Sequence, residues 1–372
     1  MTDTITTRAA VTHQAHTGWE ITELELDAPK AFEVRIKFYA SGLCHSDHHI
    51  TEGDAPVRMP VVGGHEGAGI VESVGEHVRR VKPGTEWCAR TFLPAAPADH
   101  ARRAIRACAS RVSMLSTGMF LDGTFRFHKD GEDYGDSAHW GRSPSTRWCP
   151  STPSSRSSTT FPSTWRRSPG AECPPVGAQR CTPRSPCRAD CRRLRRHGVG
   201  SNAVQGARYA GARDVIVVDP VEFKRENSKT LGATHAFADA AEAHDFVVAH
   251  TWGQLADHVI LTPHIVTEEM VNAAVQMTGK GGKVTITGIG RGEAVTLPGG
   301  FLIGYQREIR GALFGDCNPT YDIPRLLRMY MEGDLKLDEL ITRRYTLDQV
   351  NDAYQDLIDG KNIRGVIIHE EE

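Results

Sequence analysis

The sequence predicts an α/β protein with a β-rich N-terminal part and a parallel sheet between helices in its C-terminal part. Residues 1–84 carry strand patterns, whereas residues 198–372 alternate strand patterns with helical ones. Strands that alternate with helices along a chain favour parallel pairing. The 372 residues are enough for two domains with buried cores.

Several short segments define the N-terminal part. Residues 32–40 alternate apolar and polar side chains, which is the period of a half-buried strand. Residues 60–64 are an apolar run closed by glycines, and residues 69–75 form another strand pattern between glycines. The Val-Lys-Pro-Gly sequence at 81–84 is a turn signal.

The C-terminal part has clearer elements. Residues 214–219 predict a buried parallel strand that ends in an acid, and residues 202–210 before it predict a helix. Residues 281–288 form a strand pattern bracketed by glycines. Two further helices are expected at 321–331 and 347–358.

The middle of the chain has a different composition. Of the 61 residues from 137 to 197, 12 are Arg and five are Cys, while Val176 and Leu194 alone represent Val, Ile, Leu and Met. So little apolar area does not offset the cost of ordering the backbone, about 1–2 kcal/mol per residue, and predicts disorder. Residues 85–116 are unusual to a smaller degree. Our hypothesis is that both patches are read out of frame from GC-rich DNA.

Composition limits the class of protein. The net charge of −2 favours neither nucleic acid nor an anionic membrane as a partner. The polar first 13 residues lack a signal-peptide core, and no apolar run approaches the ~18 residues of a membrane span. Nine cysteines without a secretion signal predict metal binding or no function rather than a disulfide framework. We therefore expect a cytoplasmic protein.

Two motifs near the start carry metal-binding chemistry. Cys44 offers a thiolate, His65 an imidazole and Glu66 a carboxylate, which is the donor chemistry of zinc with one position open for substrate. Glu66 would either bind the metal transiently or tune the metal site from behind its ligands. Asp47 is placed to hold the imidazole of His65. The alternative is that Cys44 is a buried apolar residue and His65 a hydrogen-bonded loop histidine.

The first motif also contains groups that can move protons. Ser46 offers a hydroxyl beside the metal donors, and His49 is suited to pass a proton from it to solvent.

A second pattern predicts dinucleotide binding. Gly198 and Gly200 precede a helical segment and let its N-terminus approach a pyrophosphate. Asp219, at the end of the next strand, is placed to bind ribose hydroxyls and to favour NAD over NADP. A generic strand-turn-helix is the alternative.

At these residues the chain resembles the zinc-dependent medium-chain alcohol dehydrogenases. Residues 64–78 fit the zinc signature Gly-His-Glu-x-x-Gly-x5-Gly-x2-Val of that family. Residues 314–324 and 360–366 are similar to the actinobacterial nicotinoprotein branch, described as dependent on an artificial nitroso electron acceptor.

The resemblance implies roles for named residues. Cys44 and His65 would be catalytic zinc ligands with Glu66 nearby, and Ser46 and His49 would be the two ends of a proton relay. His45 would face a cofactor phosphate. Asp219 would bind the adenosine ribose, Lys224 would lie close to it, and Arg364 would reach the pyrophosphate.

The family also implies a fold and a reaction. A GroES-like β-rich catalytic domain over 1–175 would be interrupted by a Rossmann NAD-binding domain over 176–310, and 311–372 would complete the catalytic domain. Zinc would act as the Lewis acid while hydride passes between a primary alcohol or aldehyde and NAD. The protein would be a homo-oligomer; the particular alcohol is not predicted.

Three family features are absent from the sequence. A structural zinc site needs four closely spaced cysteines, and only Cys88 and Cys108 occur in its place, so we expect that site to be lost. Cys173 lies near the expected position of the third catalytic ligand, but its neighbours do not match. Four arginines within residues 191–197 argue against a buried first strand of the dinucleotide fold. We therefore predict poor folding or weak cofactor binding.

Other interpretations are an inactive product of a frame-shifted gene and a zinc-free reductase of the same superfamily, against which Cys44 and Glu66 argue. A third alternative is that the Arg/Ser-rich segment is a nucleic-acid-binding arm. Its lack of repeats and its displacement of structural parts argue against that reading.

Overall fold

The chain folds into two compact units. A computed structural model describes residues 4–55, 57–88, 117–120, 122–137, 191–194, 198–288, 294–297, 299–317 and 319–369. The first unit combines residues 1–173, 318–327 and 341–372, and the second combines residues 174–317 and 328–340. The domain boundaries at 175 and 310 stay predictions. None of the helices in the described ranges has the length and apolarity that a bilayer crossing requires.

The first unit contains a closed barrel with the strand order β1-β2-β7-β8-β4. Its core contains Val11, Leu24 and Tyr134, which are at most 4 % exposed. Alternating burial along β1 agrees with strands that are apolar on one side only. The barrel strands are β1 (Ile5–Thr12), β2 (Glu20–Leu26), β4 (Val61–Val62), β7 (Phe127–Lys129) and β8 (Glu132–Asp136).

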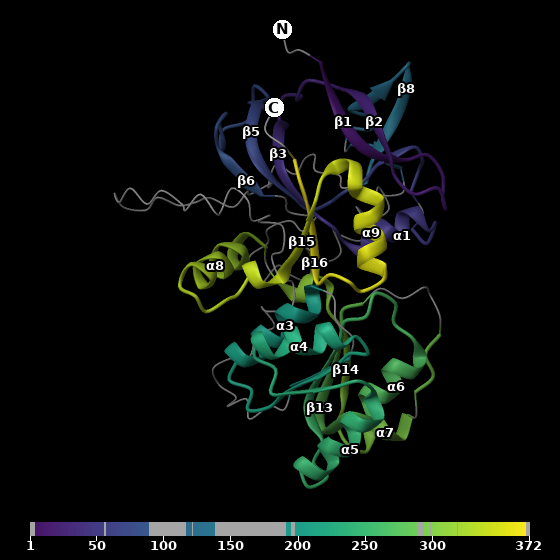
Figure 1. Cartoon of the computed structure of the whole chain (residues 1–372), viewed down its shortest axis with the longest axis vertical. Coiled ribbons are helices and arrows are strands. Elements are labelled where there is room, and N and C mark those ends of the chain that lie inside the picture. Colours follow the sequence, from purple (N-terminus) through teal and green to yellow (C-terminus); the bar gives the residue numbers. More distant parts are fainter. Residues whose placement is uncertain are drawn as a thin grey trace. The chain divides into compact units, whose positions relative to one another are not determined.

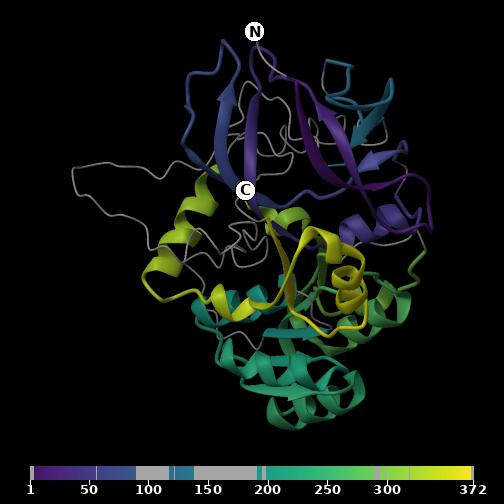
Figure 2. The same cartoon turned by 45° about the horizontal axis from the view of Figure 1, so that its top comes forward.

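A five-stranded sheet, β15-β16-β3-β5-β6, completes the first unit. Strand β16 comes from the end of the chain and pairs with β3, so the yellow C-terminal strand lies beside the purple one in Figure 2. The sheet strands are β3 (Val34–Gly42), β5 (Gly67–Val74), β6 (Glu86–Cys88), β15 (Ile341–Tyr345) and β16 (Arg364–Ile368). The same unit contains helices α1 (His45–Thr51) and α9 (Val350–Ile358) and a short 3₁₀ turn, Leu347–Gln349; another 3₁₀ turn, Asp338–Leu340, belongs to the second unit.

The second unit is built on a six-stranded parallel sheet with the order β11-β10-β9-β12-β13-β14 (Figure 1). Numbered within the unit, this order is 3-2-1-4-5-6, which is typical of dinucleotide-binding sheets. Connections between parallel strands of one sheet are right-handed as a rule, which places their helices against the faces of the sheet. The strands are β9 (Cys191–Leu194), β10 (Val215–Val218), β11 (His235–Phe237), β12 (Ala256–Leu261), β13 (Thr278–Ile286) and β14 (Glu308–Gly311).

The helices of the second unit cover this sheet and bury its core. Ala243 of α5 and Ala274 of α6 are fully buried in one cluster with Val259 and Val284 of the sheet. The helices after β9 are α3 (Gly198–Tyr209), α4 (Glu222–Thr230), α5 (Ala240–His250), α6 (Glu268–Met277) and α7 (Gly299–Ile303), followed by a 3₁₀ turn (Leu313–Asp316). Helix α8 (Pro319–Met331) crosses the division between the units.

The prediction that residues 191–197 do not supply a first strand before Gly198 was wrong. Strand β9 occupies the centre of the sheet, where its residues pair in parallel with β10 on one side and β12 on the other. Two neighbouring strands offer backbone partners along both edges of this position, and that context outweighs the unfavourable side-chain composition. The missing first strand was one of the three reasons for predicting poor folding, and this reason no longer holds.

Most of the other expected elements are confirmed with shifted ends. The predicted strand at 214–219 is β10, and the predicted helix at 321–331 is the greater part of α8. Helix α3 begins at Gly198, four residues before the predicted start at 202. Helix α1 was not predicted, because Ile50 is its single apolar residue and one residue gives no apolar period.

Candidate metal centre and cofactor-binding elements

Helix α1 begins at the first candidate metal donor. Cys44 is its N-cap in an extended conformation, and its sulfur accepts a hydrogen bond from the backbone N–H of Ser46 at 3.5 Å. A thiolate at a helix N-terminus is stabilised by the helix dipole and by free N–H groups. The same helix turns Asp47 inward, where it is fully buried.

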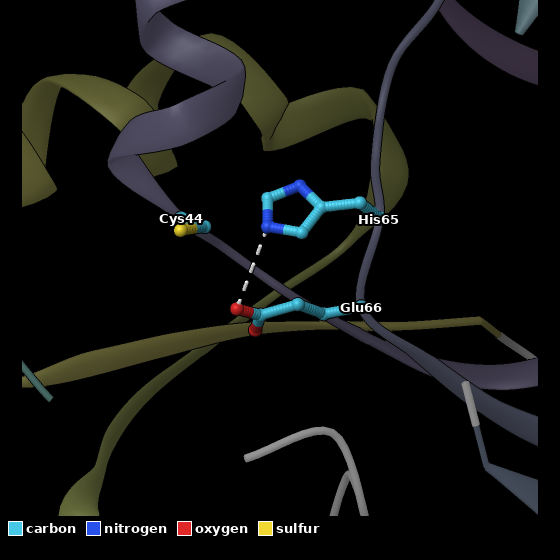
Figure 3. Close-up of side chains that lie close together, drawn as sticks. All are labelled: Cys44, His65 and Glu66. Atoms are coloured by element: carbon cyan, nitrogen blue, oxygen red, sulfur yellow. Dashed lines mark ion pairs between the residues drawn. The ribbon is translucent and has the colours of Figure 1, made fainter. Parts of the chain in front are cut away.

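The second pair of donors comes from the segment between β4 and β5. Figure 3 shows His65 and Glu66 reaching from this segment toward Cys44. The space for the Glu66 carboxylate depends on Gly42, because a Cβ at Gly42 would meet Glu66 Oε2 at 2.3 Å. The absence of a side chain at the end of β3 is therefore part of the site.

The three donors lie close enough to share one ion. Ligand atoms of Cys44, His65 and Glu66 all lie within 4.8 Å of one another, and His65 Nε2 lies 3.8 Å from Glu66 Oε1. Tetrahedral zinc with bonds of about 2.0–2.3 Å separates its ligand atoms by roughly 3.3–3.8 Å. Small side-chain movements are enough to close the set. Across the ranges that the structure describes, no other group of three such donors gathers in this way.

Asp47 fixes the orientation of His65. Its Oδ1 lies 2.9 Å from His65 Nδ1 and also accepts the backbone N–H of Gly64 at 3.2 Å. Burial disfavours the imidazolium, but the negative charges of Asp47 and Cys44 outweigh burial and raise the pKa of His65 well above its usual value. With Nδ1 directed at Asp47, Nε2 faces the other two donors, as zinc binding requires.

Arg364 holds Glu66 from the opposite side. Its Nη1 lies 3.1 Å from Glu66 Oε2, and its Nη2 donates to Oε1 at 3.4 Å. The guanidinium also donates to the carbonyl of Leu43, next to the Cys44 donor. A residue that was predicted to reach a cofactor pyrophosphate thus lies behind the metal donors.

The expected proton-transfer residues lie on α1. Ser46 and His49 are three positions apart and so lie on one side of the helix. His49 is nearly buried and its Nδ1 lies 2.9 Å from Asp54 Oδ2, whose side chain is 27 % exposed. His45 is the first residue of α1 and is half-buried.

The expected cofactor-binding residues lie in the second unit. Gly198 and Gly200 form the first turn of α3, directly beyond the carboxyl end of β9 and the point where the strand order reverses. Asp219 follows β10 and is 2 % exposed, and its carboxylate accepts the backbone N–H of Val221 at 2.9 Å. Lys224 is buried in the first turn of α4, the next helix.

Cys173 and Cys108 lie outside the described residues, while Cys88 lies on β6. The third ligand and the loss of the structural zinc site therefore stay predictions. Sequence reasoning missed Gly42, Asp54 and the pairing of Arg364 with Glu66. Only Asp54 left a local signal, an acid five residues after His49.

Fold and donors together define a class of protein. A β-barrel unit with a Cys-His-Glu cluster and a parallel 3-2-1-4-5-6 sheet are the two halves of a metal-binding, nucleotide-dependent dehydrogenase. Two sequence models agree: "Alcohol dehydrogenase GroES-like domain" matches residues 30–127, and "Zinc-binding dehydrogenase" matches residues 198–332. The chain belongs to the zinc-binding alcohol dehydrogenase family, and the predicted fold class is confirmed.

Named relatives support this placement. The chain is 45 % identical to the NDMA-dependent alcohol dehydrogenase of Amycolatopsis methanolica, over 98 % of this chain and 99 % of the relative. It is 35 % identical to alcohol dehydrogenase B of Mycobacterium tuberculosis, over 97 % and 98 % of the two chains. Its fold matches benzyl alcohol dehydrogenase of Acinetobacter calcoaceticus with a TM-score of 0.80 at 24 % identity, covering 98 % and 99 %.

Proposed function

We propose that this chain oxidises a primary alcohol, or reduces the matching aldehyde, using zinc and NAD. The observation that carries the proposal is the convergence of the Cys44 sulfur, the His65 imidazole and the Glu66 carboxylate within 4.8 Å. A sulfur, a nitrogen and an oxygen donor suit zinc with an open position for substrate. The names of the relatives support an alcohol as substrate.

The zinc would be held by Cys44 and His65, with Glu66 as the adjacent carboxylate. When bound, the metal would supply Lewis-acid chemistry that lowers the pKa of the alcohol, and the nicotinamide would supply the acceptor for the hydride. Asp47 keeps a proton on His65 Nδ1, which leaves Nε2 as the donor. Arg364 draws the Glu66 carboxylate toward itself, so Glu66 is the donor that we expect to exchange with substrate.

The proton of the alcohol would leave along α1. Ser46 is the first acceptor in this proposal and His49 the next, and the hydrogen bond of His49 to Asp54 leads toward the surface. In the second unit, Gly198 and Gly200 would carry the pyrophosphate at the start of α3, and Asp219 would bind the ribose.

A metal assay on matched cysteine variants tests the proposal. We expect purified protein to contain about one zinc per chain at Cys44, and Cys44→Ser to lose both zinc and alcohol oxidation. Cys317→Ser is the control, because Cys317 is also a half-buried cysteine but lies outside the cluster. Zinc retained by the Cys44 variant would contradict the assignment of the metal to this cluster. Alcohol oxidation unaffected by a chelator would contradict the need for zinc and favour a zinc-free reductase.

The electron acceptor needs a separate assay. The name of the Amycolatopsis relative includes dependence on NDMA, so oxidation is measured with added NAD and with NDMA as alternative acceptors. Turnover with added NAD supports an exchangeable cofactor. Turnover only with NDMA would indicate a nicotinamide that stays bound, and turnover with neither would favour an inactive product.

A further inference from the structure

One oxygen of the carboxylate behind His65 lacks an evident donor. Asp47 is fully buried, and its Oδ1 serves both His65 and Gly64. Its Oδ2 makes no hydrogen bond of good geometry with any residue that the structure describes. A buried carboxylate oxygen left without a donor is costly and uncommon in folded proteins, so a nearby donor has a reason to be there.

Tyr354 is the neighbour with the right chemistry. It lies on α9, is 7 % exposed and packs in the same core cluster as Leu43, the residue before Cys44. Burial, the negative charges of Asp47 and Cys44, and a hydrogen-bonding interaction with Asp47 raise the pKa of Tyr354 well above its usual value. The phenol therefore keeps its proton at neutral pH and has it available for a carboxylate.

The ring of Tyr354 is held in place by contacts with the barrel. Asn351, one turn earlier on α9, accepts the backbone N–H of Trp19 at 2.9 Å and donates to its carbonyl at 2.8 Å. The rings of Trp19 and Tyr354 lie with centroids 5.8 Å apart. Trp19 in turn packs against Gly63, where a Cβ would meet its ring at 2.3 Å. Tyr354 is thus tied to the segment that carries His65.

We propose that Tyr354 is a positioning residue for the metal centre: its hydroxyl donates to Asp47 Oδ2 and so fixes the carboxylate that orients His65. This inference rests on the proposed zinc function. A carboxylate held at both oxygens cannot rotate away from His65 Nδ1, so the imidazole keeps the tautomer that presents Nε2 to the metal. Tyr354 acts through Asp47 and touches neither metal nor substrate.

Zinc release from the intact protein tests this role. Substitutions behind a metal ligand typically cost about 10–100-fold in metal affinity, so Tyr354→Phe should release zinc to a chelator about tenfold faster. The cobalt-substituted variant should show shifted visible absorption bands, because the donor geometry at His65 changes. Both readouts report on the metal site rather than on folding.

Tyr345→Phe is the matched control. Tyr345 is equally buried in the same core cluster, and its hydroxyl donates to a carboxylate, Asp356, at 2.9 Å. We expect this variant to lose thermal stability without faster zinc release. Equal release rates in the two variants would overturn the inference.

A second variant covers the case in which Tyr354→Phe does not fold. Asn351→Ala keeps Tyr354 but removes the two hydrogen bonds between Asn351 and the backbone of Trp19. This variant should also release zinc faster. Wild-type release rates in the variants that fold would refute the positioning role alone. A wild-type protein that binds no zinc would instead refute the proposed function, and the inference with it.

Discussion

Arg364 provides the sharpest test of how the metal centre is held together. Replacing it with methionine keeps most of the side-chain volume but removes the guanidinium that contacts Glu66 and the Leu43 carbonyl. The side chains of Arg364 and Glu66 are only 10 % and 13 % exposed, so water cannot readily replace the lost contacts. The variant therefore leaves a negative charge in a largely buried place.

The size of the effect follows from the geometry. At the 3.1 Å between Arg364 Nη1 and Glu66 Oε2, and an effective dielectric constant near 20, the attraction is about 5 kcal/mol. Removing one partner of a buried pair costs about 3–5 kcal/mol in measured cases. We expect R364M to lower the free energy of unfolding of the metal-free first unit by about 3–5 kcal/mol at pH 7.

Urea unfolding followed by tryptophan fluorescence measures this loss. Trp19 is buried in the first unit and reports on it, whereas Trp252 of the second unit is 90 % exposed and changes little. Adding Glu66→Gln to R364M removes the stranded charge and should restore about half of the lost stability. A loss below about 1 kcal/mol for R364M, or no recovery in the double variant, would refute the reasoning.

Three further predictions concern other parts of the chain. Gly42→Ala should weaken zinc binding by displacing the Glu66 carboxylate, measured by competition with a chelator; Gly311→Ala, with open space around it, is the control. Zinc affinity should fall up to about tenfold per pH unit as the solution becomes more acidic, because zinc must displace the proton that Asp47 and Cys44 favour on His65; a pH-independent Kd would contradict this. The pKa of His258 is lowered to about 4 by burial and by the charges of Lys283 and Arg310. As the pH falls, His258 is therefore protonated in the unfolded state before it is protonated in the folded state. The free energy of unfolding should drop by about 1–3 kcal/mol as pH falls from about 6.5 to about 4, allowing for partial solvent exposure. Amide hydrogen exchange in β12 measures this drop, and in His258→Gln its dependence on pH should be flatter.

Local pattern was enough to predict much of the fold. The apolar run at 214–219 and the glycines around 69–75 mark β10 and β5, because burial and turn geometry leave a signature within a few residues. Local pattern did not predict strand β9. Its place is set by pairing with β10 and β12, which are distant in sequence, and not by its own side chains. Composition alone therefore misjudged the centre of the sheet.

The candidate site was predictable only where its residues are close in sequence. The motifs containing Cys44 and His65 indicate metal ligands through residue type and spacing. The partner of Glu66 lies 298 positions away, and Tyr354 belongs to a helix that pattern identifies only as amphipathic. Long-range pairing of this kind leaves no mark in a local window, because it depends on how β16 and α9 return to the first unit.

The return of the chain end to β3 also sets an order of events during synthesis. Cys44, His65 and Glu66 leave the ribosome before Arg364, which follows Glu66 by 298 residues. At about 5–20 residues per second, that interval lasts roughly 15–60 s. For most of that interval the donors have neither the guanidinium nor the phenol behind them, so a metal ion that binds during synthesis meets an incomplete site until β16 has been made.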